Sequence, residues 1–69
     1  MRYAVLFEKT GTGYSAHVPD LPGCVAAGST LAETTDLIRG ASRMHLAGIA
    51  EDGDAIPEQK TIAEYIVAA

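Results

Sequence analysis

The chain has 69 residues, which is enough for one small domain and excludes a two-domain enzyme. Hydrophobic residues make up 48% and charged residues 20%, so the chain is too apolar for a disordered protein. Five basic against nine acidic residues give a net charge of -4, and the basic residues are dispersed. Because nucleic-acid binders draw affinity from neutralised phosphates, we expect no direct nucleic-acid partner, and the acidic charge favours a basic partner.

The single cysteine, Cys24, excludes an internal disulfide, so a reducing compartment is the simpler setting. The apolar run near the start, residues 3–7, is too short for a signal peptide. No run approaches the roughly 18 residues that span a bilayer. The sequence therefore predicts a cytoplasmic protein with no membrane contact.

Three strands are expected in the first 28 residues. Two stretches alternate apolar and polar side chains with a period of two, and the glycine-containing segment 10–13 between them predicts a hairpin. Pro22 and Gly23 then suit the two central positions of a type II turn, after which small residues form a third short strand. We expect these strands at residues 2–9, 14–18 and 24–28.

A long helix and a last strand complete the expected fold. The run Thr30-Leu31-Ala32-Glu33 matches a capping box, and apolar or small residues recur at helical spacing behind it, which predicts a helix over residues 30–50. Residues 61–68 again alternate and predict a fourth strand. The order is βββαβ, an α+β domain in which one long helix packs on one face of a small antiparallel sheet.

Such a fold leaves apolar surface without a cover. The aromatic face of the first strand, Tyr3, Val5 and Phe7, is expected to need a cover of its own, and a hydrophobic last strand at a sheet edge exposes backbone pairing groups. Self-association through the last strand would satisfy both needs. We therefore predict a homodimer or tetramer, with an interface at Tyr65, Ile66 and Val67.

The residues offer little for catalysis. Only Glu8 and Glu64 lie in expected strands, near strand ends, where a solvated edge explains them better than a magnesium site. His17 and Cys24 flank the proline-glycine turn but lack a third residue to orient a base, and Cys24 suits packing. One cysteine and two separated histidines are too few for zinc. We predict no catalytic residues, no metal and no cofactor.

The run from Tyr14 to Cys24, YSAHVPDLPGC, followed by Gly28 to Glu33, GSTLAE, resembles the HicB antitoxin family of type II toxin–antitoxin systems. The resemblance covers nearly the whole chain. It implies a truncated ribonuclease H-like fold without catalytic acids. It also implies that the protein binds and masks HicA, a small basic toxin that cleaves RNA. Family members usually carry a C-terminal DNA-binding domain, and the chain as given is expected to be a short form without one.

For the partner surface we predict His17, Asp20 and Glu33, polar residues expected to flank the exposed edge of the sheet. Two alternatives remain open at this point. One is a residual nuclease of ribonuclease H type, which fold resemblance alone supports. The other is a structural oligomer with an unknown partner.

Overall fold

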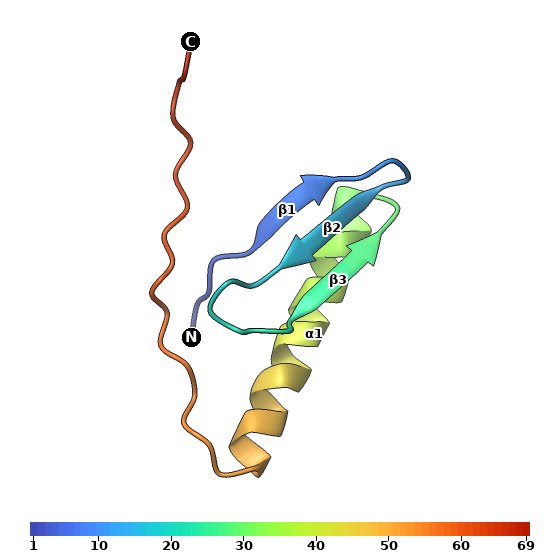
Figure 1. Ribbon diagram of the computed structural model, residues 1–69. Helices are drawn as coiled ribbons and strands as arrows, with labels where there is room; N and C mark the ends of the chain where they lie inside the picture. The colour runs from blue at the N-terminus through green and yellow to red at the C-terminus, as the bar shows by residue number, and fades with distance from the viewer.

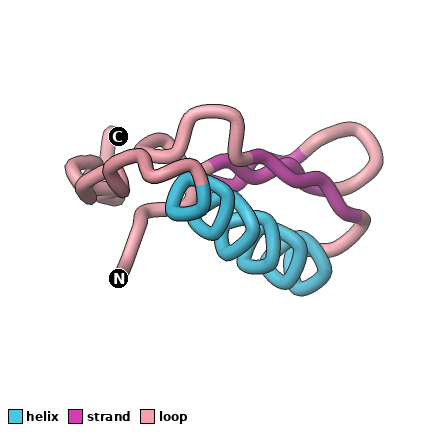
Figure 2. The backbone as a smooth tube through the Cα atoms, turned by 90° about the horizontal axis from the view of Figure 1, so that it is seen from below, coloured by secondary structure: helices cyan, strands magenta, loops and turns pink.

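The computed structural model describes all 69 residues and contains three strands followed by one helix. The strands are β1 (Leu6–Lys9), β2 (Tyr14–His17) and β3 (Val25–Gly28), and the helix is α1 (Leu31–Glu51). The sheet order is β1-β2-β3, and both neighbouring pairs are antiparallel. The helix crosses one face of the sheet, and the C-terminal part of the chain leaves this two-layer body (Figure 1, Figure 2). The α+β class with an antiparallel sheet and one long helix is confirmed.

Both turns form as their residues predict. In the hairpin, the amide of Thr10 donates to the carbonyl of Gly13 at 2.9 Å. In the second turn, the amide of Cys24 donates to the carbonyl of Leu21 at 3.0 Å, and Gly23 adopts φ 83°. That positive φ is the conformation a type II turn requires at this position, so the glycine is needed there.

The first strand is shorter than its alternating pattern predicts. Pairing begins at Leu6, which lies opposite His17, the last residue of β2. Beyond His17 the chain turns away through Val18 and Pro19, so residues 2–5 have no neighbouring strand. The alternating pattern therefore includes residues 2–5, which have no strand to pair with in this chain.

The expected fourth strand, residues 61–68, is not formed. This segment is extended but pairs with no strand of the chain, and Figure 1 shows it leaving the body on the side of β1. Strand pairing needs a neighbour, and the chain alone does not place this segment against an edge. Glu64, expected in that strand, is an exposed residue of the extended segment.

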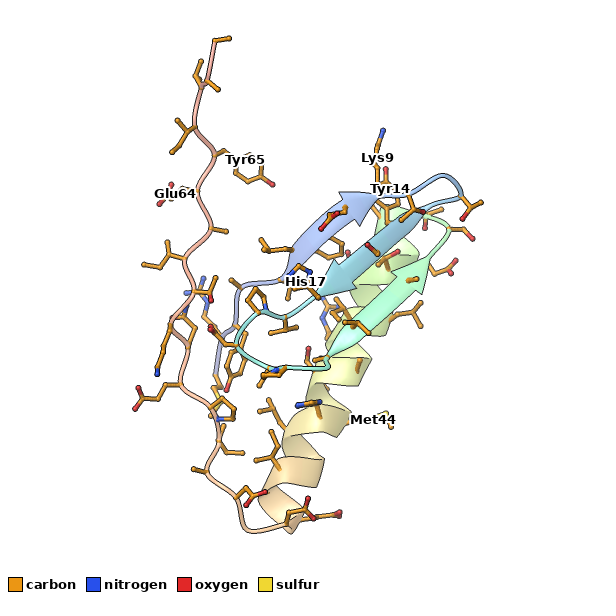
Figure 3. All side chains as sticks on the ribbon, in the orientation of Figure 1. Lys9, Tyr14, His17, Met44, Glu64 and Tyr65 are labelled. Atoms are coloured by element: carbon orange, nitrogen blue, oxygen red, sulfur yellow. The ribbon has the colours of Figure 1, made fainter.

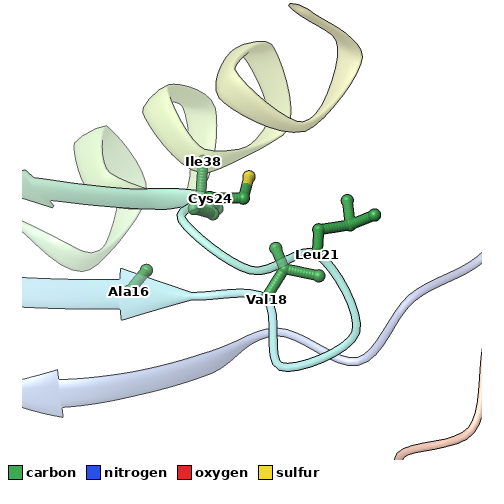
Figure 4. Packing of buried hydrophobic residues seen from close by; sticks show 5 residues of the cluster. All are labelled: Ala16, Val18, Leu21, Cys24 and Ile38. Carbon is green, nitrogen blue, oxygen red and sulfur yellow. The ribbon is translucent and has the colours of Figure 1, made fainter. Parts of the chain in front are cut away.

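The core lies between the sheet and α1. Its five buried residues come from β2, the loop after it and the helix (Figure 4): Ala16, Val18, Leu21, Cys24 and Ile38. Tyr3, Val5 and Phe7 pack against this cluster. The expectation that α1 leaves this aromatic face uncovered is therefore wrong, because α1 packs on it, although Tyr3, Val5 and Phe7 stay only partly buried. The opposite face of the sheet has no covering element.

The helix begins as the capping pattern predicts. The Thr30 side chain accepts a hydrogen bond from the Glu33 amide at 3.0 Å, and the Glu33 carboxylate accepts one from the Ser29 amide at 3.4 Å. The first contact satisfies an amide that the first turn leaves without a partner, and the second ties the residue before the N-cap to the helix. Thr34, which the hydrophobic pattern did not single out, is fully buried, and its hydroxyl is satisfied there by donating to the Thr30 carbonyl at 2.7 Å.

Candidate functional site: the outer sheet face

The face of the sheet that α1 does not cover is the main candidate for binding. We call it the outer sheet face. The register aligns Phe7, Ala16 and Ala26 on the core side, so the alternate residues project the other way. They form two rows across the three strands: Leu6, His17 and Val25, then Glu8, Ser15 and Ala27.

This face carries both apolar and polar side chains. Val25 is 65% exposed, which is high for a β-branched residue in a strand. His17 lies beside it in the central strand and offers ring nitrogens for hydrogen bonding (Figure 3). The next row adds the carboxylate of Glu8. An uncovered sheet face with an exposed apolar side chain beside polar groups is suited to contact with another protein.

The three residues predicted for the partner surface lie apart. His17 is at the centre of the outer sheet face, Asp20 is in the loop beyond the end of β2, and Glu33 is at the start of α1 beside the opposite end of the sheet. The structure does not gather them into one patch. Glu33 serves the helix cap, which occupies part of its carboxylate.

Asp20 holds the C-terminal segment to the body. Its carboxylate accepts hydrogen bonds from the Lys60 amide at 2.9 Å, the Thr61 amide at 3.0 Å and the Thr61 hydroxyl at 2.8 Å. Nearby, the Tyr3 hydroxyl donates to the Pro57 carbonyl at 2.5 Å. These bonds join residues that lie 40 to 54 positions apart in the sequence, and they fix where the segment departs. We call the Asp20 contacts the C-terminal latch.

The latch has a pH dependence whose direction follows from its geometry. The hydrogen bonds from the Thr61 and Lys60 amides stabilise the carboxylate and hold the pKa of Asp20 below its usual 3.8. A lowered pKa in the folded state means that the contribution to stability is complete above the unfolded value and is lost as pH falls through the folded one. We expect the latch to be closed at neutral pH and to open only below pH 3.8.

This expectation can be checked by an NMR titration of the Lys60 and Thr61 amides. The chemical shifts of both amides should change together with a midpoint below pH 3.8. Their hydrogen-exchange protection should fall as the latch opens. In Asp20→Asn the shared transition should disappear, since no carboxylate is left to titrate. A midpoint above 3.8 in the parent protein would contradict the lowered pKa.

Beyond the latch the side chains of the C-terminal segment are exposed to solvent. Tyr65 is 102% exposed, Ile66 84% and Val67 91%, so the predicted interface residues have no partner in the single chain. Tyr65 and Glu64 point to opposite sides of the extended backbone, as in a strand (Figure 3).

The arrangement provides no assembled catalytic group. His17 lies on the outer sheet face, whereas Cys24 is buried and its sulfur lies 3.6 Å from the Ser42 hydroxyl. No group of three or more His, Cys, Asp or Glu side chains gathers in a geometry suited to a metal ion. No helix of the structure is long and apolar enough to cross a membrane.

Sequence reasoning missed Leu6 and Val25 as surface residues. Both were assigned to strands, but the alternation alone did not say which face α1 would cover. Only the side of the sheet on which Phe7 packs settles that Leu6 and Val25 lie on the face without the helix. The sequence held one indication of which face is covered: Tyr3, Val5 and Phe7 lie on the same side of the first strand, and bulky apolar side chains such as these suit the core.

The fold is that of a small α+β domain with one uncovered sheet face. A model of the HicB-like antitoxins of bacterial toxin–antitoxin systems matches residues 3–69. The chain belongs to the HicB-like antitoxin family.

Two relatives illustrate the similarity. An uncharacterized 14.9 kDa protein from the rep-hol intergenic region of Haemophilus phage HP1 (strain HP1c1) is 39% identical over 66 residues, which is 96% of this chain and 50% of that protein. The chain thus spans half the length of that curated relative. A chain of a solved HicA3 and HicB3 toxin–antitoxin complex is 28% identical, with a TM-score of 0.72 over 86% of this chain and 70% of that one.

Proposed function

We propose that the protein is a non-catalytic antitoxin domain that binds and masks a small basic RNA-cleaving toxin of the HicA type. The observation that carries the proposal is the family match over residues 3–69, supported by the similarity to a chain of a HicA3 and HicB3 complex. Such a role belongs in the cytoplasm, where the toxin meets its RNA. No nucleic acid has to contact this domain directly.

The charge of the chain suits that partner. A net charge of -4 attracts a basic protein over a distance and raises its rate of association. A toxin surface that holds RNA phosphates is also the surface that an acidic protein can occupy, so binding would exclude the substrate by competition. The outer sheet face, with Glu8, His17 and Val25, is the surface we assign to this contact.

The test is co-expression with a HicA-type toxin, sought among small basic proteins encoded next to this chain. The pair should restore growth and co-purify, and association should slow as salt rises. Val25→Lys places a positive charge in the centre of the outer sheet face and should weaken binding at least tenfold, which is about 1.4 kcal/mol. Met44→Lys is the matched control, because Met44 is 77% exposed on α1.

The outcomes separate two statements. Failure of the unmodified proteins to form a complex would refute the antitoxin role. A complex that Val25→Lys and Met44→Lys weaken equally, or not at all, would leave that role intact and move the contact away from the outer sheet face.

We further propose that the protein self-associates, as a homodimer or tetramer, through Tyr65, Ile66 and Val67. The support is their exposure: three large side chains in an extended segment would remain in water in a single chain. Light scattering at micromolar concentration measures the mass directly. Ile66→Lys should shift the protein to a monomer and leave toxin binding in place.

A further inference from the structure

A groove runs along the open edge of the sheet, between α1 and the stretch from Met1 to Phe7 that leads into β1. It encloses about 520 Å³. The inner part of its apolar wall includes Val5 and Phe7 from the sheet side and Ile38 and Leu46 from the helix. All but Ile38 are only partly buried, although they pack on the core. The groove therefore exposes the side of the core that α1 and the three strands leave uncovered.

The border of the groove is basic in an acidic protein. The chain has five basic residues, and three of them, its only arginines, line this hollow: Arg2, Arg39 and Arg43. Arg39 pairs with Asp36 at 3.3 Å, but both side chains are largely exposed, so this pair is weak. The groove suits an occupant that is mainly apolar and carries a negative charge.

The edge beside the groove can accept a strand. β1 pairs only with β2, so its other side presents free amide and carbonyl groups. A strand added there would lie over the groove and place every second side chain against its apolar wall. The sheet would then have four strands.

The C-terminal segment has the matching properties. After the latch, residues 62–69 are extended and apolar, and Glu64 is their only charged residue. Eight extended residues reach about 26 Å, more than the length of β1. In its own chain the segment starts beside Met1 to Ala4, with which Ile62 and Ala63 border a second hollow, and then leads away from the groove.

We propose that the segment 62–68 of a second copy adds to the free edge of β1 and fills this groove. The exchange is mutual, so two identical contacts related by a two-fold axis bury both segments and both grooves. Glu64 brings its charge to an edge bordered by arginines. The fourth strand that the sequence pattern predicts thus forms between chains. This inference rests on the proposed self-association and is independent of toxin binding.

Disulfide trapping between differently tagged chains tests the arrangement. In a Cys24→Ala background, one chain carries Arg43→Cys and the other carries Ile66→Cys or Val67→Cys. Because neighbouring strand residues face opposite sides, mild oxidation should join the chains through one of these two positions and not equally through both. Met44→Cys in place of Arg43→Cys is the control, because Met44 does not line the groove. Circular dichroism checks that each variant folds.

Each result decides something. A mixed-chain disulfide at Arg43→Cys that exceeds the Met44→Cys control at least tenfold supports the exchange. A disulfide that forms only within a chain carrying both substitutions overturns it, because the segment then fills its own groove. A dimeric mass without either disulfide overturns the groove while self-association stands. If the parent protein is still a monomer at about 100 µM, both the exchange and the self-association are refuted.

Discussion

Replacing Leu21 with alanine is expected to cost about 3 kcal/mol of folding free energy, because a buried leucine truncated to alanine leaves a cavity that the core fills only in part. Leu21 has no exposed surface, and it sits on the loop between β2 and β3, where it packs with Val18 and Cys24 (Figure 4). A domain of this size is stabilised by roughly 3 to 10 kcal/mol in total. The variant should therefore be partly unfolded under mild conditions.

Urea unfolding at a fixed protein concentration measures this effect, since any association would couple stability to concentration. Leu37→Ala makes the same chemical change on α1, where Leu37 is 46% exposed, and should cost less than about 1 kcal/mol. Equal losses for the two variants would mean that the loop between β2 and β3 is not part of the core. A changed slope with urea would point to altered compactness instead.

Leu21 illustrates a part of the fold that could not be predicted from the sequence, in contrast to the turns and the helix cap. Turns and caps depend on local chemistry, so the Pro22-Gly23 turn and the Thr30 cap were predictable from a few adjacent residues. A leucine between two prolines looks like part of an exposed loop. Its burial depends on how the loop packs with Val18, Cys24 and Ile38, which no local pattern encodes.

The fourth strand failed as a prediction for a similar reason. The alternation in residues 61–68 predicts an extended segment whose two faces carry different side chains, and the segment is extended in the structure. Whether it becomes a strand depends on a partner edge, which is a property of the whole assembly. The candidate site divides in the same way: His17 was found as a polar residue of a strand, whereas Val25 became a candidate only when the covered face was known.

Asp20 illustrates a role that spacing could not suggest. A carboxylate next to a proline-glycine turn was a reasonable candidate for contact with a basic toxin. In the fold it lies near Lys60 and Thr61 and accepts their hydrogen bonds, which commits it to the C-terminal latch. Charge reversal there would therefore change the path of the C-terminal segment as well as the surface charge, and it is a poor first choice for testing toxin binding.

Replacing Gly13 with alanine is expected to destabilise the domain by about 2 to 3 kcal/mol, as overpacking of a tight site does. Gly13 lies at the end of the hairpin turn, directly against the junction between β3 and α1. A Cβ atom there would overlap the Gly28 carbonyl oxygen and lie 2.9 Å from the Ser29 Cα. Both obstacles are backbone, so no side chain can rotate aside. The strands would have to separate.

Gly11→Ala is the matched control, because a Cβ atom at Gly11 meets nothing within 4 Å and its φ is not positive. It should change stability by less than about 0.5 kcal/mol, as most surface substitutions do. Thermal or urea unfolding compares the two variants, and amide exchange of β3 should rise in Gly13→Ala alone. If Gly13→Ala were as stable as Gly11→Ala, the hairpin could not lie against the start of α1, and the outer sheet face would lose the register that aligns His17 with Val25.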